Sequence, residues 1–208
     1  MTKRMAIFAS GRGSNADAIH AAVSDGTIKA QIVVLVCDVP GAAVIEKAEA
    51  WNVPVILAPR KQFASQGDFE AYILQQLEPY HIDMIVLAGF MRILSGSFIS
   101  HYEKKILNIH PALLPSFKGL HAQRQAVEAG VKIAGCTVHF VEPDMDSGPI
   151  IAQTAVPVYD YDTEDTLAAR ILEVEHPTFV KAVSLFCDDK LSIQGRVVTC
   201  SQTKGANL

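Results

Sequence analysis

The side chains best placed to do chemistry are Asn108 and His110, which stand two positions apart at the end of an expected strand at residues 106–109. Because side chains alternate along a strand, this spacing puts an amide and an imidazole on the same face. Open α/β sheets form their sites at the carboxyl ends of strands, where such a pair could stabilise a developing charge and move a proton. An isolated Asn and His could equally be satisfied by nearby backbone groups.

An acidic loop follows a second expected strand, at residues 137–141, and contains Glu142, Asp144 and Asp146. A loop carboxylate at the end of a strand can orient a nearby histidine or stabilise its charge. The same acids could be ordinary solvated loop residues. Metal binding is a weak alternative, because no histidine lies at ligand spacing and the 4 cysteines form no paired motif. We therefore expect no metal site.

A glycine-rich turn, Gly11-Arg12-Gly13-Ser14-Asn15-Ala16, follows the first expected strand and opens a helix. Glycines allow a tight turn, and the N–H groups at a helix start favour an anion, so phosphate is the preferred ligand. The spacing also permits a dinucleotide fingerprint with Asp38 as the ribose-binding acid, although a turn role for Asp38 is the simpler interpretation. A bare strand-to-helix turn is the alternative without a ligand. A P-loop is excluded, because no Gly-Lys-Ser/Thr follows.

The elements that must position these residues alternate between short apolar runs and helical patterns. Continuous apolar strands separated by helices predict an α/β fold, with a Rossmann-like, mostly parallel twisted sheet and helices on both faces. We expect strands at residues 5–9, 32–37, 53–57, 84–88, 106–109, 137–141 and 150–158, and a terminal hairpin from 191–193 and 196–198. We expect helices at residues 15–24, 42–51, 67–78, 123–130 and 163–186. The last helix should kink or break at Pro177, and residues 201–208 should fray.

Composition excludes several classes of protein. The 208 residues are 50% hydrophobic and 19% charged, which is too apolar for a wholly disordered chain. Lys and Arg number 18 against 22 acids and aromatics make up 7%, so neither a basic surface nor a base-stacking surface for nucleic acid is indicated. The longest apolar runs fall far short of the ~20 residues of a membrane helix. We expect no nucleic-acid or membrane partner, and the scattered cysteines are typical of a reducing compartment.

Four segments, taken in order, resemble the phosphoribosylglycinamide formyltransferases. They are Gly-Arg-Gly-Ser-Asn at 11–15, Leu-Ala-Gly-Phe-Met-Arg-Ile-Leu at 87–94, Asn-Ile-His-Pro-Ala-Leu-Leu-Pro-Ser-Phe-Lys-Gly at 108–119, and the block at 135–151. Enzymes of this family pass a formyl group from 10-formyltetrahydrofolate to glycinamide ribonucleotide in purine synthesis. The resemblance implies the same reaction here, with a reduced folate as cosubstrate and no metal. Because the sequence shows no targeting segment, we expect a cytoplasmic protein, acting as a monomer or homodimer.

The resemblance assigns roles residue by residue. It implies a catalytic trio of Asn108, His110 and Asp146, the choice of Asp146 over Asp144 resting on the match at Asp-Ser-Gly-Pro. It places the ribonucleotide at Arg12, Gly13, Ser14, Asn15, His121 and Glu175. It places the folate at Met91, Arg92, Ile93, Leu94, Asn108, Val141 and Asp144. We expect one formyltransferase domain over residues 1–200, with a phosphate-binding half at 1–100 and a catalytic and folate-binding half at 101–200.

Direct attack of the substrate amine on the formyl carbon would need no acyl-enzyme. Asn108 would donate a hydrogen bond to the tetrahedral oxyanion, and a protonated His110 would stabilise the same charge and take part in proton transfer. The carboxylate of Asp146 would favour the charged imidazole. The cysteines then have no chemical role.

Two positions depart from the family pattern, and three other functions compete. Gln66 stands where relatives often have a basic residue, so a contact to the folate glutamate tail is not carried over, and of a frequent His-x-His pair only His121 is present. Formyltetrahydrofolate deformylases use a similar core with water as acceptor, but carry a regulatory domain and lack the phosphate loop. Methionyl-tRNA formyltransferases need an RNA-binding domain. A non-catalytic NAD-binding domain would use residues 11–16 and Asp38 but leaves the trio unexplained.

Overall fold

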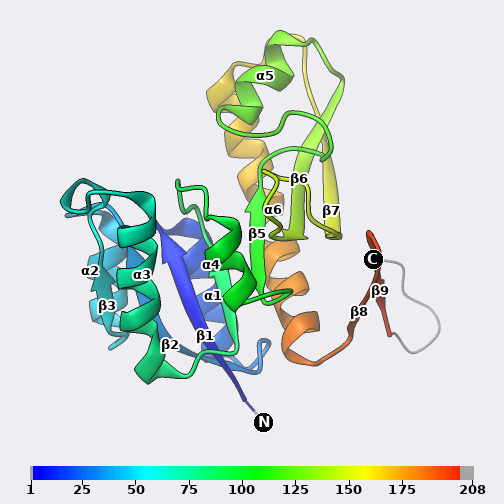
Figure 1. The fold of residues 1–208 in the computed structure, drawn as a ribbon. Coiled ribbons are helices and arrows are strands. Elements are labelled where there is room, and N and C mark those ends of the chain that lie inside the picture. The colour runs from blue at the N-terminus through cyan, green and yellow to red at the C-terminus, as the bar shows by residue number, and fades with distance from the viewer. Residues whose placement is uncertain (1, 202–208) are drawn as a thin grey trace. The chain divides into compact units, whose positions relative to one another are not determined.

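The computed structural model describes residues 2–201 and divides into two compact units, Met1–Leu107 and Asn108–Leu208 (Figure 1). Strand β5, Ile106–His110, spans the boundary between them. Among the described residues, no helix is both long and apolar enough to cross a membrane.

The first unit contains four parallel strands in the order β3-β2-β1-β4. These are β1 Lys3–Ala9, β2 Ala30–Cys37, β3 Val55–Leu57 and β4 Met84–Leu87. The central strand β1 pairs with β2 at Ile7–Leu35 and with β4 at Ile7–Val86, and all three side chains are buried. Burial on both faces explains why these strands appear in the sequence as continuous apolar runs. The mostly parallel α/β fold is thus confirmed.

Helices flank this sheet because each crossover between parallel strands needs one. They are α1 Ser14–Ser24, α2 Ala43–Ala50, α3 Gln66–Leu77 and α4 Gly96–His101, with single 3-10 turns at Arg60–Gln62 and Glu78–Tyr80. Figure 1 shows α3 on one side of β1 and α1 on the other. Sequence analysis missed α4, because its six residues bury only Phe98 and Ile99 and are too short to show a helical period.

The second unit is built on an antiparallel pair. Strand β6, Ile133–Phe140, pairs with β7, Ile150–Pro157, in a register that places Cys136 opposite Thr154. The expected terminal hairpin is confirmed as β8, Leu191–Gln194, and β9, Val197–Cys200, with β9 joining β7 at Ile150–Val197. The hairpin thereby extends the sheet beside the strand that follows the acidic loop.

Two helices complete the second unit, α5 Ala122–Glu128 and α6 Glu164–Cys187. A capping box formed by Thr163 and Thr166 begins α6. The helix continues through Pro177 without a break, because residues on both sides of it, such as Ile171 and Phe179, are fully buried. Tertiary packing therefore outweighs the local cost of the proline.

The expectation of a frayed tail concerns mostly residues 202–208, which lie outside the described residues. Ser201 itself is ordered by the hairpin, since its backbone N–H donates to the carbonyl oxygen of Lys190 at 2.9 Å.

Candidate active site

The second unit brings together the three side chains that the sequence singled out for catalysis. Strand β5 carries Asn108 and His110, and the loop after β6 carries Asp146. Nδ1 of His110 lies 3.5 Å from Oδ2 of Asp146, and both side chains are largely buried. Nε2 of His110 lies 2.8 Å from the carbonyl oxygen of Phe117. Both ring nitrogens therefore face acceptor oxygens, an arrangement suited to a protonated imidazole that donates on both sides.

The backbone around Asp146 fixes where its carboxylate points. Asp146 has a left-handed backbone conformation, with φ of 48°, which Asp tolerates better than most residues. Its Oδ2 accepts a hydrogen bond from the backbone N–H of Gly119 at 2.8 Å. One Asp146 oxygen thus holds the loop that follows His110 while facing the His110 ring.

The ends of the acidic loop are also held in place. A Cβ at Gly148 would come within 1.8 Å of the Phe140 carbonyl oxygen, so only glycine allows this close approach of the two backbones. The hydroxyl of Ser147 donates to the Asp144 carbonyl at 2.7 Å, and Arg196 of the terminal hairpin donates to the Ser147 carbonyl at 2.5 Å. The side chain of Asp144 is exposed, unlike that of Asp146. The geometry therefore favours Asp146 as the acid that acts on His110.

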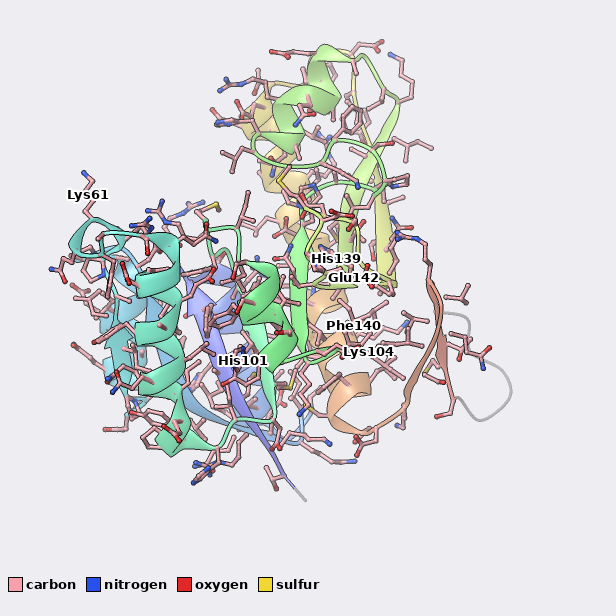
Figure 2. All side chains as sticks on the ribbon, viewed as in Figure 1. Lys61, His101, Lys104, His139, Phe140 and Glu142 are labelled. Atoms are coloured by element: carbon pink, nitrogen blue, oxygen red, sulfur yellow. The ribbon has the colours of Figure 1, made fainter. Side chains whose placement is uncertain are left out.

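Sequence analysis missed a fourth member of the site, His139 on β6. Figure 2 shows His139, Phe140 and Glu142 where β6 ends and the acidic loop begins. His139 is 2% exposed, and its Nε2 lies 3.2 Å from Nδ2 of Asn108 and 3.7 Å from Oδ1 of Asp146. The available signal was a histidine inside an apolar strand, since a buried imidazole must find polar partners.

The hydrogen bonds of His139 define its tautomer. Nδ1 lies 2.8 Å from the Phe140 carbonyl oxygen, which can only accept, so Nδ1 carries the proton. Nε2 is then free to accept an N–H of Asn108. Burial lowers the pKa of His139 below its ordinary value of 6.5. The charges of His110 and Lys118 also lower this pKa, whereas the hydrogen bond to the Phe140 carbonyl and the charge of Asp146 raise it. A neutral His139 therefore orients the Asn108 amide.

This arrangement offers one free donor and one positive charge to a negatively charged oxygen. An asparagine amide has two N–H groups, and His139 takes one of them, which leaves the second in a defined direction. A protonated His110 would supply the positive charge, and its Nε2–H becomes a second donor and a source of a proton once it leaves the Phe117 carbonyl. Such preorganised donors stabilise the oxyanion of an acyl-transfer reaction.

Comparison with known proteins agrees with this chemistry. The sequence matches the family described as formyl transferase over residues 3–183. The chain belongs to the formyl transferase family. It is 43% identical over 181 residues to a phosphoribosylglycinamide formyltransferase of Bacillus subtilis, an alignment that covers 87% of this chain and 93% of the relative.

Solved structures show the same fold. A glycinamide ribonucleotide transformylase of Symbiobacterium toebii superimposes with a TM-score of 0.93 at 41% identity, covering 96% of this chain and 94% of that one. A formyltetrahydrofolate deformylase of Pseudomonas syringae gives a TM-score of 0.88 at 23% identity, covering 96% of this chain and 66% of that one. At that identity the second similarity concerns the fold alone.

The glycine-rich turn of this formyl transferase forms an open helix start in the first unit. Gly13, with φ of 76°, is the N-cap of α1 and no side chain caps the helix. A Cβ at Gly13 would meet Cγ2 of Val44 at 2.5 Å, so the turn requires glycine for its conformation and for space. The first N–H groups of an uncapped helix are suited to bind an anion. Arg12 is exposed beside them, and Ser14 and Asn15 are the first two residues of the helix.

Asp38 is not available as the ribose-binding acid of a dinucleotide site. Asp38 is 3% exposed, and its carboxylate accepts hydrogen bonds from the hydroxyl of Ser10 at 2.5 Å and from Nε of Arg92 at 2.6 Å. A carboxylate bound in this way is not presented to a ribose. Asp38 is also not merely a turn residue, because its carboxylate binds Ser10 and Arg92.

The remaining residues implied by the resemblance fall into exposed and buried groups. In the first unit, Met91 and Ile93 are 65% and 66% exposed, whereas the Leu94 side chain is buried. In the second unit, His121 is exposed at the start of α5, with Nδ1 3.5 Å from Oε1 of Glu164, and Val141 is half-buried at the start of the acidic loop.

Glu175 is buried on α6, close to a cysteine. Burial raises the pKa of the Cys136 thiol to about 11, with a further contribution from the charge of Glu175. That thiol is therefore protonated and unreactive at neutral pH. Among residues 2–201, no group of three or more His, Cys, Asp or Glu side chains is arranged to hold a metal ion.

The neutral state of His139 predicts a specific pH dependence of stability. The unfolded chain binds a proton at His139 near pH 6.5 and the folded chain binds it only at lower pH, so the free energy of unfolding falls as the pH drops below that value. Between about pH 7.5 and about pH 5.5 we expect His139 to account for a loss of up to about 1.4 kcal/mol. Urea unfolding of the wild type and of His139→Gln at both pH values measures this contribution.

His101→Gln is the matched control, because His101 lies exposed on α4. This variant should keep the pH dependence of the wild type, whereas His139→Gln should show a smaller one. Equal pH dependence in all three proteins would contradict a neutral, buried His139.

Proposed function

We propose that this chain transfers the formyl group of 10-formyltetrahydrofolate to the amine of glycinamide ribonucleotide, giving formylglycinamide ribonucleotide and tetrahydrofolate in de novo purine biosynthesis. The observation that carries the proposal is the cluster of Asn108, His110 and Asp146 in a formyl transferase chain. The names of the relatives in Bacillus subtilis and Symbiobacterium toebii support this choice of acceptor.

The reaction forms one bond and breaks another. The neutral amine of the ribonucleotide attacks the formyl carbon, and the carbonyl oxygen becomes the oxyanion of a tetrahedral intermediate. The bond between that carbon and N10 of the folate then breaks as the oxyanion reforms the carbonyl. One proton leaves the attacking nitrogen and one proton arrives at N10, so the proton count is balanced.

Asn108 supplies the fixed donor for the oxyanion. Its amide keeps one N–H on Nε2 of His139, and the second N–H is directed at the reacting oxygen. A donor of this kind typically contributes about 10²–10³ in rate. His139 acts through Asn108, because a protonated His139 would present a second donor to the amide and turn it away.

His110 supplies the proton and the positive charge, and Asp146 stabilises that charge. A protonated His110 stabilises the oxyanion through its charge and serves as the acid for N10 when its Nε2–H leaves the Phe117 carbonyl, a contribution of about 10²–10⁴ in rate. Asp146 lies on the opposite ring nitrogen and stabilises the imidazolium between turnovers. Direct attack requires no covalent enzyme intermediate, which accords with the buried, protonated Cys136.

The other residues provide binding. In the first unit, Gly13, Ser14 and Asn15 hold the phosphate at the start of α1 with Arg12 beside them, and the folate binds along residues 91–94. In the second unit, His121 and Glu175 bind the ribonucleotide, and Val141 and Asp144 contact the folate. We place these residues in one formyltransferase domain over residues 1–200, with a phosphate-binding half at 1–100 and a catalytic and folate-binding half at 101–200. Since one chain carries every proposed catalytic residue, it could act as a monomer or as a homodimer. We place the protein in the cytoplasm, where we expect it from the sequence.

The decisive experiment measures tetrahydrofolate release from 10-formyltetrahydrofolate with and without glycinamide ribonucleotide. We expect release only when the ribonucleotide is present, with the formyl group recovered on its amine. Equal release without it, accompanied by free formate, would make the protein a deformylase. No release under either condition, together with binding of NADH, would favour a nucleotide-binding domain instead.

Replacement of the catalytic acid tests the role of the second unit. Asp146→Asn keeps an oxygen that can accept from Gly119 but removes the negative charge beside His110, so we expect turnover to fall by about 10²–10⁴ with little change in thermal stability. Asp144→Asn, from the same loop, should keep its kcat and change at most the KM for 10-formyltetrahydrofolate, since we place Asp144 against the folate only. The reverse pattern in steady-state kinetics would show that Asp144 is the catalytic acid.

A further inference from the structure

Two buried carboxylates hold the segment between β4 and α4, defined here as the Gly89–Ser95 loop. Asp38, at the end of β2, holds its first half. The hydroxyl of Ser10 donates to Asp38 and accepts the backbone N–H of Met91 at 2.9 Å, while Nε of Arg92 donates to the other carboxylate oxygen at 2.6 Å. The backbone N–H of Ser10 also donates to the Gly89 carbonyl at 3.0 Å. The loop is thereby fixed to the ends of two strands.

Glu70, on α3, holds the other half. It is 4% exposed, and its Oε1 accepts the backbone N–H of Ser95 at 2.7 Å, while its Oε2 accepts the Ser95 hydroxyl. That hydroxyl also caps α4 by accepting the backbone N–H of Phe98. One carboxylate therefore determines where the loop ends and the helix begins.

Gln66, one turn before Glu70, completes this contact. Its Nε2 donates to Oε1 of Glu70 at 2.9 Å and to the carbonyl oxygen of Ile93 at 3.0 Å. The Gln66 side chain is thus engaged with the loop backbone. A glutamine in this role fixes the Ile93 peptide and has no charge to offer to a ligand carboxylate.

Buried carboxylates are costly unless hydrogen bonds compensate the loss of water. Here the compensating donors come largely from the Gly89–Ser95 loop, so the two acids can be satisfied only when the loop has this conformation. The loop nevertheless leaves the side chains of Met91 and Ile93 mostly exposed. A fixed backbone that presents apolar side chains is typical of a preformed ligand surface.

We propose that Glu70 and Asp38 are positioning residues, which hold the Gly89–Ser95 loop as a preformed surface for the formyl donor. The inference rests on the proposed function, since it assigns the reduced folate to this loop. Preorganisation of this kind removes the entropic cost of ordering the loop when the donor binds. The carboxylates act on the donor only through the loop and do not touch it.

Glu70→Gln is the sharper test, because the Glu70 side chain bonds to Ser95 and Gln66, whereas Asp38 bonds to Ser10 next to the phosphate-binding turn at residues 11–15. The amide retains one acceptor oxygen but turns an NH₂ group toward the donors of Ser95. We expect the KM for 10-formyltetrahydrofolate to rise about tenfold, since a hydrogen bond to a charged group is lost, while the KM for glycinamide ribonucleotide stays within about twofold. Gln66→Ala should shift the same KM in the same direction by a smaller factor.

Ile73→Val is the matched control on the same helix, since Ile73 is fully buried and lies one turn beyond Glu70. It should lower stability without separating the two KM values. An equal rise of both KM values in Glu70→Gln, or the same pattern in Ile73→Val, would overturn the proposal.

Amide hydrogen exchange of the free protein provides a readout that needs no catalysis. The amides of Met91 and Ser95 should exchange faster in Asp38→Asn and Glu70→Gln, respectively, than in the wild type and in Ile73→Val. Unchanged exchange would refute the positioning role even if a variant loses activity. Conversely, a wild type that transfers no formyl group but shows this exchange pattern would refute the proposed function and leave the positioning of the loop intact.

Discussion

The chemistry assigned to this formyl transferase depends on one partly buried hydrogen bond, between the amide of Asn108 and the bare ring nitrogen of His139. An amide side chain can rotate and can exchange the places of its oxygen and nitrogen, so by itself it is a poor oxyanion donor. The ring of His139 removes that freedom because it can only accept at this position. Its other nitrogen is committed to the Phe140 carbonyl in the same strand. The local backbone of β6 therefore determines the direction of a donor on β5.

Both units contain a carboxylate that accepts hydrogen bonds from a loop. In each unit these hydrogen bonds hold a segment that lies outside the helices and strands. Asp146 receives the N–H of Gly119 and so ties the loop after β5 to the acidic loop. Glu70 receives the N–H and hydroxyl of Ser95 and so sets the start of α4. In each case removal of the acceptor would leave partly buried donors without this partner, which costs free energy beyond the loss of the hydrogen bond itself. Each acceptor thereby favours one conformation of the loop that it binds.

The sequence predicted the parallel sheet, most helices and the pairing of an amide and an imidazole on one strand, because these depend on local periodicity. It could not predict His139, since an imidazole within an apolar strand shows that a partner is needed but not which one. Nor could it predict the environment of Asp38, which depends on Ser10 and Arg92 from distant parts of the chain. At Pro177 the local rule predicts a kink or a break, and the break is absent because burial of the residues on both sides of it keeps α6 continuous. Roles in binding came from resemblance and remain predictions.

The most direct test of this account is the tautomer of His139 in the free protein. Nitrogen-15 NMR of the imidazole rings, with His139 assigned by comparison with His139→Gln, distinguishes a protonated nitrogen from a bare one. At neutral pH the account predicts a neutral ring with the proton on Nδ1 and a bare Nε2 that accepts a hydrogen bond. A ring that is charged, or neutral with its proton on Nε2, would contradict it, because either form would turn the amide of Asn108 away from the direction in which it must donate.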